Sequence, residues 1–379
     1  MINYNSNKLL SFLIGFFVPF QIFTSFLLLN TPTNVIWLLG FLLFNKFSLN
    51  SNLRPFFLPL LILLIKLPLG GSIEIFLKLI VGVVFLNTIS SGLQIKEFRN
   101  GLLIASFISL FFAIYQYIIT LNNPFNSYDF FKSLLIPGKE WHVILKDDRD
   151  IPRVPGFMYE PAYLSMIYCI VLSIELIYVK SSNKWILLLC FIGILLSNSR
   201  IGFISLSFIM LLKLVLYISK INYIRILYII SVFLPITPIF FKYNELINYR
   251  EFIDIIDISF FARYISFIAF INEPISSILF GVINYHQTYS SNIIFSSFTD
   301  ILANEGSSYD PKSLLADNLF LFGIVGSLIF YYSFAKIYWT KIRSLIIITL
   351  SNIIFFNVYA YSWPLYWIFI SLAFIHVED

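Results

Sequence analysis

The chain has 379 residues, of which 59% are apolar and only 12% are charged, and its mean hydropathy is +0.86. Soluble proteins carry about 25% charged residues, so this composition excludes a soluble globular protein and indicates a membrane protein with many spans. The net charge is +5. The two cysteines, Cys169 and Cys190, both lie in apolar stretches, which excludes a disulfide framework and a cysteine-based zinc site.

Twelve apolar stretches approach the ~20 residues that a helix needs to cross the bilayer core. They are 9–29, 33–48, 55–69, 72–90, 101–121, 161–179, 184–199, 201–219, 223–241, 318–338, 344–360 and 362–377. The first has no small-residue cleavage site after it, which favours a helix over a removed signal peptide. We therefore expect an all-α polytopic membrane protein with about twelve transmembrane helices, forming a single integral membrane domain over residues 1–379.

The distribution of basic residues predicts the orientation. If the N-terminus is cytoplasmic, the inner connections carry thirteen basic residues, whereas the short outer turns carry only Arg200. The thirteen are Lys8, Lys46, Arg54, Lys96, Arg99, Lys180, Lys184, Lys213, Lys220, Arg225, Lys336, Lys341 and Arg343. Because cytoplasmic loops are enriched in Lys and Arg, both termini are expected inside.

Two longer segments, 122–160 and 242–317, then emerge on the outer face, where we expect the extramembrane chemistry. The sequence has no dinucleotide-binding glycine motif, no P-loop, no HExxH and no paired CxxC. The inner loops are also too short to bind a nucleotide. We therefore expect no cofactor and no metal, and a substrate that arrives already activated, from the membrane or from the outer aqueous side.

Two arginines occupy settings in which a cation is unusual. Arg200 lies in the tight turn 197–202 at the start of a span, where free backbone N–H groups and a guanidinium together favour a phosphate. The alternative is that Arg200 snorkels to the lipid headgroups. Arg263 is the only charge between Ile258 and Ile271, so it needs an anion or a neighbouring carboxylate as its partner.

Three residues are candidates for an acid or a base. Glu160 comes just before a predicted span, and Arg153 lies seven residues ahead of it. Asp317 opens another span and is followed by Asn318. Either carboxylate could instead serve only as a helix cap. His286, in the second outer segment, is the third candidate, with simple exposure as the alternative.

Charges inside the spans are few. Lys66 and Glu74 flank the turn at Gly70 and Gly71 and are expected to pair across that hairpin. An ion-coupled transporter would place such charges deeper, on facing helices.

Two short motifs resemble sequence motifs of a family of membrane enzymes. The stretch from Arg153 to Pro161 resembles the R-x-x-G-x-x-x-E-P pattern of Wzy-type polysaccharide polymerases. The sequence Ser199-Arg200-x-Gly202, between two spans, looks like the S-R-x-G turn that these polymerases share with the O-antigen ligases.

Two further motifs follow in the family's order, and the likeness covers about residues 150–330. Arg263, ahead of Glu273-Pro274 and Phe280-Gly281, is similar to the arginine of the family's large periplasmic loop. Asp317-Asn318, before Gly323-x-x-Gly326, looks like the family's H/D-N and G-x-x-G entry to the next span. The ligases carry His-Asn at this place, and the interval to the glycines is shorter here, so the polymerases are favoured.

The resemblance implies a metal-independent glycosyltransferase in the bacterial inner membrane, with its active site facing the periplasm. Its donor and acceptor would be undecaprenyl-diphosphate-linked oligosaccharides, which it would join into a surface polysaccharide such as O-antigen, capsule or exopolysaccharide. A chain-length regulator and a flippase are expected as membrane partners, and nucleic acid is not. In this interpretation Arg153, Arg200 and Arg263 bind the diphosphate. The base is then Asp317 first, Glu160 second and His286 third.

Two alternatives remain open. The first is an O-antigen ligase that transfers finished glycan to a lipid core and differs only in its acceptor. The second, from another class, is a lipid-linked sugar flippase or other transporter. Transporters commonly show repeat symmetry and charges at the membrane midplane, neither of which is clear in this sequence.

Overall fold

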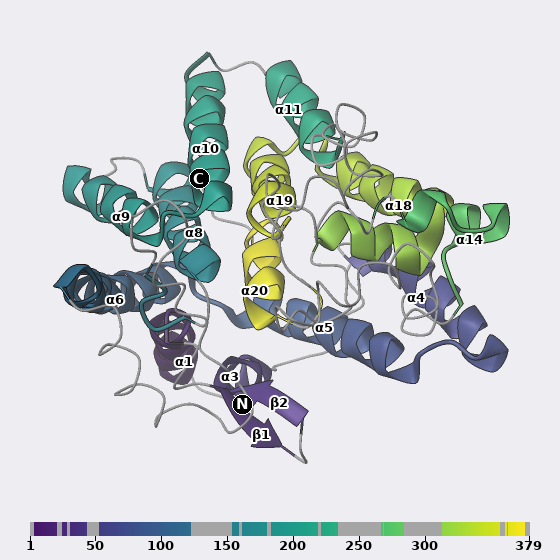
Figure 1. The fold of residues 1–379 in the computed structure, drawn as a ribbon, viewed down its shortest axis with the longest axis horizontal. Helices are drawn as coiled ribbons and strands as arrows, with labels where there is room; N and C mark the ends of the chain where they lie inside the picture. The colour runs from purple at the N-terminus through teal and green to yellow at the C-terminus, as the bar shows by residue number, and fades with distance from the viewer. Residues whose placement is uncertain are drawn as a thin grey trace. The chain divides into compact units, whose positions relative to one another are not determined.

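The described part of the computed structural model is almost entirely helical (Figure 1). It comprises residues 4–20, 25–28, 31–43, 53–122, 154–158, 161–179, 183–218, 221–233, 267, 269–283, 313–356, 361 and 363–375. The helices are α1 (Tyr4–Phe17), α3 (Val35–Leu42), α4 (Arg54–Lys66), α5 (Ile73–Gly92), α6 (Ile95–Asn122), α8 (Pro161–Tyr178), α9 (Lys184–Ser197), α10 (Arg200–Ile218), α11 (Ile221–Phe233), α14 (Ile275–Phe280), α18 (Leu314–Tyr338), α19 (Ile342–Ile354) and α20 (Pro364–Leu372). A 3₁₀ turn, η2 (Leu67–Leu69), follows α4, and strands β1 (Ser25–Leu28) and β2 (Thr31–Asn34) form an antiparallel hairpin.

Five of the described helices are long and apolar enough to cross a membrane, namely α5, α6, α8, α10 and α18. Helices α1, α9, α11 and α19 are apolar but shorter. The chain is therefore a helical membrane protein, as predicted. Each predicted span overlaps a described helix, whereas the crossing of the membrane by all twelve stays a prediction. Most of the outer segments 122–160 and 242–317 lies outside the described residues.

The first predicted span, 9–29, is wrong at its C-terminal end. Helix α1 ends at Phe17, and strands β1 and β2 follow in place of a continued helix. Pro19 disfavours a helical conformation in the residue before it, which explains the stop although apolar residues continue. The next helix, α3, begins after Asn34, whose side-chain oxygen accepts a hydrogen bond from the amide of Ile36 at 2.9 Å.

The chain divides into two compact units, each made of separate stretches. Unit 1 consists of Met1–Ser48, Phe85–Lys220 and Trp367–Asp379, and unit 2 of Leu49–Val84 and Ile221–Tyr366. In unit 1, α1 packs along α6, and α8 contacts α9 and α10. In unit 2, α18 contacts α4, α14 and α19, and α11 packs on α19. This division does not test whether residues 1–379 form a single integral membrane domain, which stays a prediction.

Helices α1 and α6 approach so closely in unit 1 that glycine is required on both sides. A Cβ at Gly15 would lie 2.0 Å from the carbonyl oxygen of Phe98, and one at Gly101 would lie 2.1 Å from that of Phe12. Small residues at such crossings allow the backbones of membrane helices to touch. This contact fixes α6, which in turn holds α8 and the segment before it.

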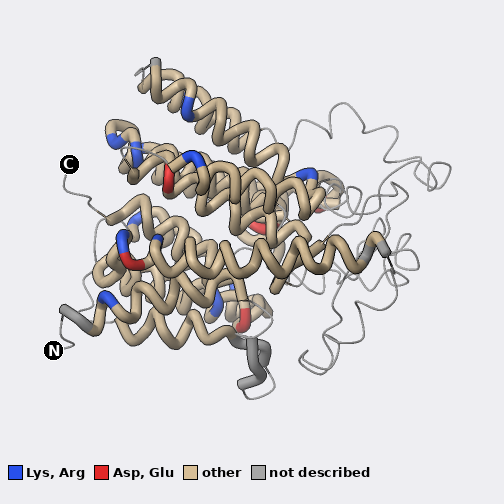
Figure 2. The backbone as a smooth tube through the Cα atoms, turned by 90° about the vertical axis from the view of Figure 1, so that its left-hand side faces the viewer, with Lys and Arg blue, Asp and Glu red and all other residues tan. Residues whose placement is uncertain are grey.

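A partly buried ion pair joins α6 to α8. Arg99 Nη2 donates to Glu175 Oε2 at 2.9 Å, and Arg99 Nε donates to the other carboxylate oxygen. Glu175 is completely buried, and Figure 2 shows how few charges the helices carry along their length. Further along, the hydroxyl of Tyr168 donates to the carbonyl oxygen of Ser106 at 3.0 Å. From the first contact to the second, the residue number rises along α6 and falls along α8, so the two helices are antiparallel. This is consistent with the predicted topology.

We expect Arg99→Leu to destabilise the protein by about 3–5 kcal/mol, because it leaves the carboxylate of Glu175 buried without its counter-ion. Thermal unfolding of the purified protein in detergent measures this change. The double variant Arg99→Leu/Glu175→Leu should be more stable than Arg99→Leu alone, since it removes both charges. Lys96→Leu, an exposed change three residues earlier, should shift stability by no more than about 0.5 kcal/mol. Wild-type stability in Arg99→Leu would contradict the expected role of the pair.

The predicted orientation can be tested with two exposed positions. Leu69, 61% exposed, lies in η2 on the predicted outer side, and Tyr217, 88% exposed, lies near the predicted inner end of α10. The native thiols of Cys169 and Cys190 are buried and should not interfere. In spheroplasts, a membrane-impermeant maleimide should label Leu69→Cys directly but Tyr217→Cys only after permeabilisation. Direct labelling of Tyr217→Cys would reject this topology.

Candidate functional site

The first two sequence motifs are neighbours in unit 1. The amide of Val154 donates to the carbonyl oxygen of Leu196 at 3.3 Å, just before the turn that carries Arg200. Val154 and Met158 are both buried. The segment 154–158 therefore lies against the end of α9, although it is far from that helix in the sequence.

Gly156, the glycine of the first motif, is held by a side chain of α6. Its φ of 62° is a conformation that glycine adopts without steric cost. Its amide donates to Gln116 Oε1 at 2.9 Å, and its carbonyl oxygen accepts from Gln116 Nε2 at 3.2 Å. Next to it, the ring of Phe157 stacks on Phe112 of α6, with centroids 4.0 Å apart. Gln116 thus provides hydrogen-bond partners for the amide and the carbonyl of Gly156. Inside a membrane protein, a non-helical segment would otherwise leave such backbone groups unsatisfied.

A sharp turn places Arg200 at the first position of α10. Asn198 ends α9 in the left-handed conformation, with φ of 42°, and its amide donates to the carbonyl oxygen of Leu195. A Cβ at Gly202 would lie 2.6 Å from Ser165 Cβ, so glycine lets α10 approach α8. Arg200 is exposed. Because a helix N-terminus is already positive, a guanidinium there concentrates positive potential where an anion can bind.

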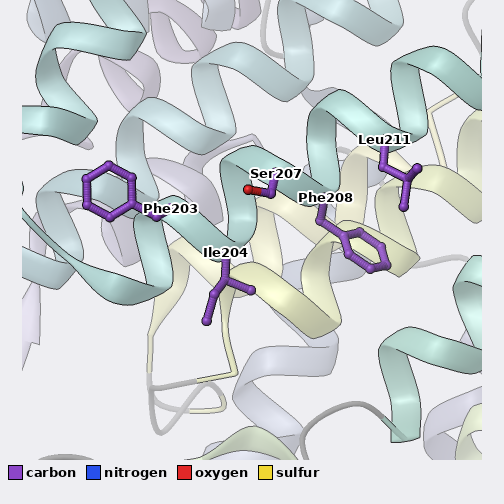
Figure 3. A pocket seen from close by; sticks show the side chains of 5 residues that line it. All are labelled: Phe203, Ile204, Ser207, Phe208 and Leu211. Atoms are coloured by element: carbon purple, nitrogen blue, oxygen red, sulfur yellow. The ribbon is translucent and has the colours of Figure 1, made fainter.

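A shallow, open apolar hollow of about 350 Å³ lies on the surface of α10, beginning three residues after Arg200. Figure 3 shows its lining. The lining residues all belong to α10: Phe203, Ile204, Ser207, Phe208 and Leu211. Positions three, four, seven and eleven residues after Arg200 share its side of a helix. One side of α10 thus combines a cation at its end with an apolar surface along its length.

The third and fourth motifs are neighbours in unit 2. Helix α18 is broken at Gly323, which has φ of 67° and ψ of −177°. A Cβ at Gly323 would lie 2.3 Å from the carbonyl oxygen of Leu279, so only glycine fits this contact. The amide of Val282 donates to the carbonyl oxygen of Phe320 at 2.8 Å. The Phe280-Gly281 motif is therefore packed against the break in α18.

Asp317 lies in the first turn of α18 but does not cap it. The N-cap is Ser313, whose side-chain oxygen accepts from the amide of Ala316 at 3.4 Å. The interpretation of Asp317 as an N-cap is therefore wrong, because the helix begins earlier than the hydropathy pattern indicated. Asp317 is completely buried, and a negative side chain is electrostatically favourable in this first turn.

Asn318 is held by two tyrosines. Its Nδ2 donates to the hydroxyl of Tyr331 at 2.8 Å, and the hydroxyl of Tyr361 donates to its Oδ1. The hydroxyl of Tyr228 on α11 in turn donates to the carbonyl oxygen of Tyr331 at 2.6 Å. Asn318 is completely buried. This network ties the first turn of α18 to the part of the helix beyond the break, and also to α11.

Lys66, the last residue of α4, does not pair with Glu74, so the predicted ion pair is wrong. Its Nζ donates to the carbonyl oxygens of Leu321 at 2.6 Å and Val282 at 2.9 Å. Glu74 instead pairs with Lys78 one turn along α5, at 2.6 Å. The break in α18 leaves carbonyl groups that need donors, and the Lys66 side chain, only 7% exposed, supplies one of them, to Leu321.

The remaining predicted site residues, Arg153, Glu160, Arg263 and His286, lie outside the described residues. Their roles stay predictions. Arg200 belongs to unit 1 and Asp317 to unit 2, and each is placed within its own unit. Within the part of the chain that is described, no group of three or more His, Cys, Asp or Glu side chains could hold a metal ion.

Sequence reasoning missed three features of these sites. It did not predict that Gln116 hydrogen-bonds to Gly156, that two tyrosines hold Asn318, or that Lys66 donates to a carbonyl at the break in α18. Only Lys66 gave a visible signal, as a charge inside an apolar stretch. Comparisons of the chain with models of protein families, with curated proteins and with solved structures give no match.

Proposed function

We propose that the chain is a metal-independent glycosyltransferase of the inner membrane that polymerises lipid-linked oligosaccharide repeat units on the periplasmic face. The growing glycan would be transferred from its undecaprenyl diphosphate carrier to a sugar of the next lipid-linked unit. The product would be a surface polysaccharide. Within the membrane, a flippase would supply the units and a chain-length regulator would limit the product.

The observation that carries this proposal is the combination of Arg200 with the apolar hollow on α10. A polyprenyl diphosphate has an anionic head and a long apolar tail, and one side of α10 offers a matching cation and apolar surface in that order. Contact between the first two motifs in unit 1, and between the last two in unit 2, adds support, because the resemblance rests on these four segments.

The reaction would be a displacement at the anomeric carbon of the donor. The acceptor hydroxyl oxygen forms the new bond to that carbon, while the bond to the diphosphate oxygen breaks and the diphosphate leaves with the electron pair. Fixed guanidinium groups, from Arg153, Arg200 and Arg263, would stabilise the charge that accumulates on the leaving diphosphate. The proton of the acceptor hydroxyl goes to a base.

Asp317 is the first candidate for that base, with Glu160 second and His286 third. The carboxylate of Asp317 sits in the first turn of a half-helix whose far end is fixed by Lys66 and Val282. It is fully buried, so an acceptor hydroxyl reaches it only when the groups that cover this turn move. If that movement does not occur, the proposed role passes to Glu160, and after it to His286.

Deletion of the gene tests the proposal in the cell of origin. Loss of polymerisation should leave a single repeat unit on the lipid core, or only short lipid-linked glycan. Accumulation of long glycan without attachment would indicate a ligase. Complete absence of surface glycan, with lipid-linked units trapped inside, would indicate a flippase.

One observation favours a transporter as the second candidate. Secondary transporters often bind substrate at broken membrane helices and use buried charges. Here α18 is broken at Gly323, and Lys66 lies at the break. The discriminating measurement is flipping of a fluorescent lipid-linked oligosaccharide by the purified protein in liposomes, with no acceptor present.

We expect Arg200→Lys to lower polymer formation, because lysine keeps the positive charge but lacks the bidentate guanidinium fork. The decrease should be about 10²-fold, as for the loss of one well-placed hydrogen-bond donor to the leaving group. Glycan length in membranes, normalised to protein level, measures the effect. Arg54→Lys is the matched control, since Arg54 is also exposed at the first position of a helix but on the predicted inner side. Equal activity of both variants would remove Arg200 from the donor site.

The choice of base can be decided by Asp317→Asn and Glu160→Gln. Loss of the base should reduce the rate by about 10²- to 10⁴-fold while protein abundance stays normal. Because Ser313 caps α18, Asp317→Asn leaves the cap intact, so its effect reports on the carboxylate itself. Wild-type polymer from Asp317→Asn, together with loss in Glu160→Gln, would transfer the role to Glu160.

A further inference from the structure

The break in α18 leaves backbone groups among buried residues, since Phe320, Leu321 and Phe322 are at most 3% exposed. Gly323 interrupts the helix, so the carbonyl groups of the turn before it have no partners further along the same helix. In the apolar interior of a membrane protein, each such group costs several kcal/mol if it stays unsatisfied. The break therefore persists only because other parts of unit 2 provide donors.

Two donors come from separate segments. The amide of Val282, just after α14, donates to Phe320 O, and Lys66 Nζ at the end of α4 donates to Leu321 O. The same ammonium also donates to Val282 O at 2.9 Å, so Lys66 bridges both segments. The positive φ of Gly281, 81°, and the 2.6 Å from its notional Cβ to Leu321 O show that these backbones touch. Lys66 is thus at the centre of a three-segment contact.

The position of Lys66 also suits its charge. The carbonyl end of a helix carries a partial negative charge, which a cation stabilises. Lys66 places its ammonium at the carbonyl end of the half-helix 314–322, while Asp317 lies in the first turn at the opposite end. The Lys66 ammonium and the Asp317 carboxylate therefore complement the dipole of this half-helix, one at each end.

We propose that Lys66 is a positioning residue, which holds the carbonyl end of the half-helix 314–322 and thereby fixes the Asp317 and Asn318 turn for the reaction. Asp317 lies four residues before Leu321, so one helical turn separates the carboxylate from the carbonyl that Lys66 binds. A rigid half-helix transmits a shift at one end to the other. This inference rests on the proposed polymerase function for its catalytic consequence, but not for the contact itself.

Lys66→Met tests this role, because methionine retains an apolar stem of similar length and removes the ammonium. In proteoliposomes with purified lipid-linked repeat units, kcat should fall by about 10²-fold, since a displacement of roughly 1 Å at a catalytic group has this scale. KM should change little, because Lys66 is not placed at the substrate. Lys78→Met, at a lysine that pairs within α5, is the matched control and should keep wild-type kcat.

Amide hydrogen exchange provides a second measurement that does not depend on the reaction. In Lys66→Met, the amides of 314–322 and 281–283 should exchange about tenfold faster or more, because the local opening free energy falls. The amides of 324–338 should remain as in the wild type. If Lys66→Met does not accumulate, Lys66→Gln, which retains a shorter donor, replaces it in both measurements.

The outcomes separate this inference from the proposed function. Lower kcat together with faster exchange in 314–322 supports positioning through α18. Lower kcat with unchanged exchange, or faster exchange with unchanged kcat, overturns it, as does failure of both variants to accumulate. A wild-type chain without polymerase activity rejects the proposed function, and exchange then still decides whether Lys66 holds the half-helix.

Discussion

The need to satisfy backbone hydrogen bonds away from water determines how this chain can depart from regular helix. Within a membrane, an irregular stretch persists only where protein groups provide its partners. Two departures, at Gly156 and at Gly323, follow this rule. Gln116 satisfies the amide and the carbonyl of Gly156 in unit 1, and Lys66 with Val282 satisfies the broken end of α18 in unit 2. In each unit, the irregular stretch is also a motif on which the family resemblance rests.

Much of the helical layout was predictable because the bilayer makes hydropathy a direct signal. Helices α8, α9 and α10 begin and end within a few residues of the predicted spans. Errors arose where a local residue outweighed hydropathy. Pro19 ends the first helix inside an apolar stretch, and Ser313 starts α18 before its apolar stretch begins. Both residues are visible in the sequence, but hydropathy averaged over a span does not weigh them.

The candidate site was less predictable, because its contacts join residues far apart in the chain. Lys66 and Glu74 are close in sequence, which favoured a pair across their turn. Lys66 instead donates to the carbonyl oxygens of Leu321, at the break in α18, and of Val282, just after α14. Glu74 has Lys78 one turn away. Nothing in the local sequence around Lys66 indicates that a helix some 250 residues later is broken at a suitable place.

The partners of Lys66 also bear on the choice between an enzyme and a transporter. A coupling charge in a transporter has to exchange partners during the cycle, and it is commonly paired with another ionisable group. Lys66 instead donates hydrogen bonds to two backbone carbonyl oxygens, of Val282 and Leu321, and so joins two segments. Such a contact stabilises a rigid break more readily than a moving one. A fixed half-helix around the buried Asp317 and Asn318 suits the proposed polymerase, because displacement at an anomeric carbon requires its base in constant geometry.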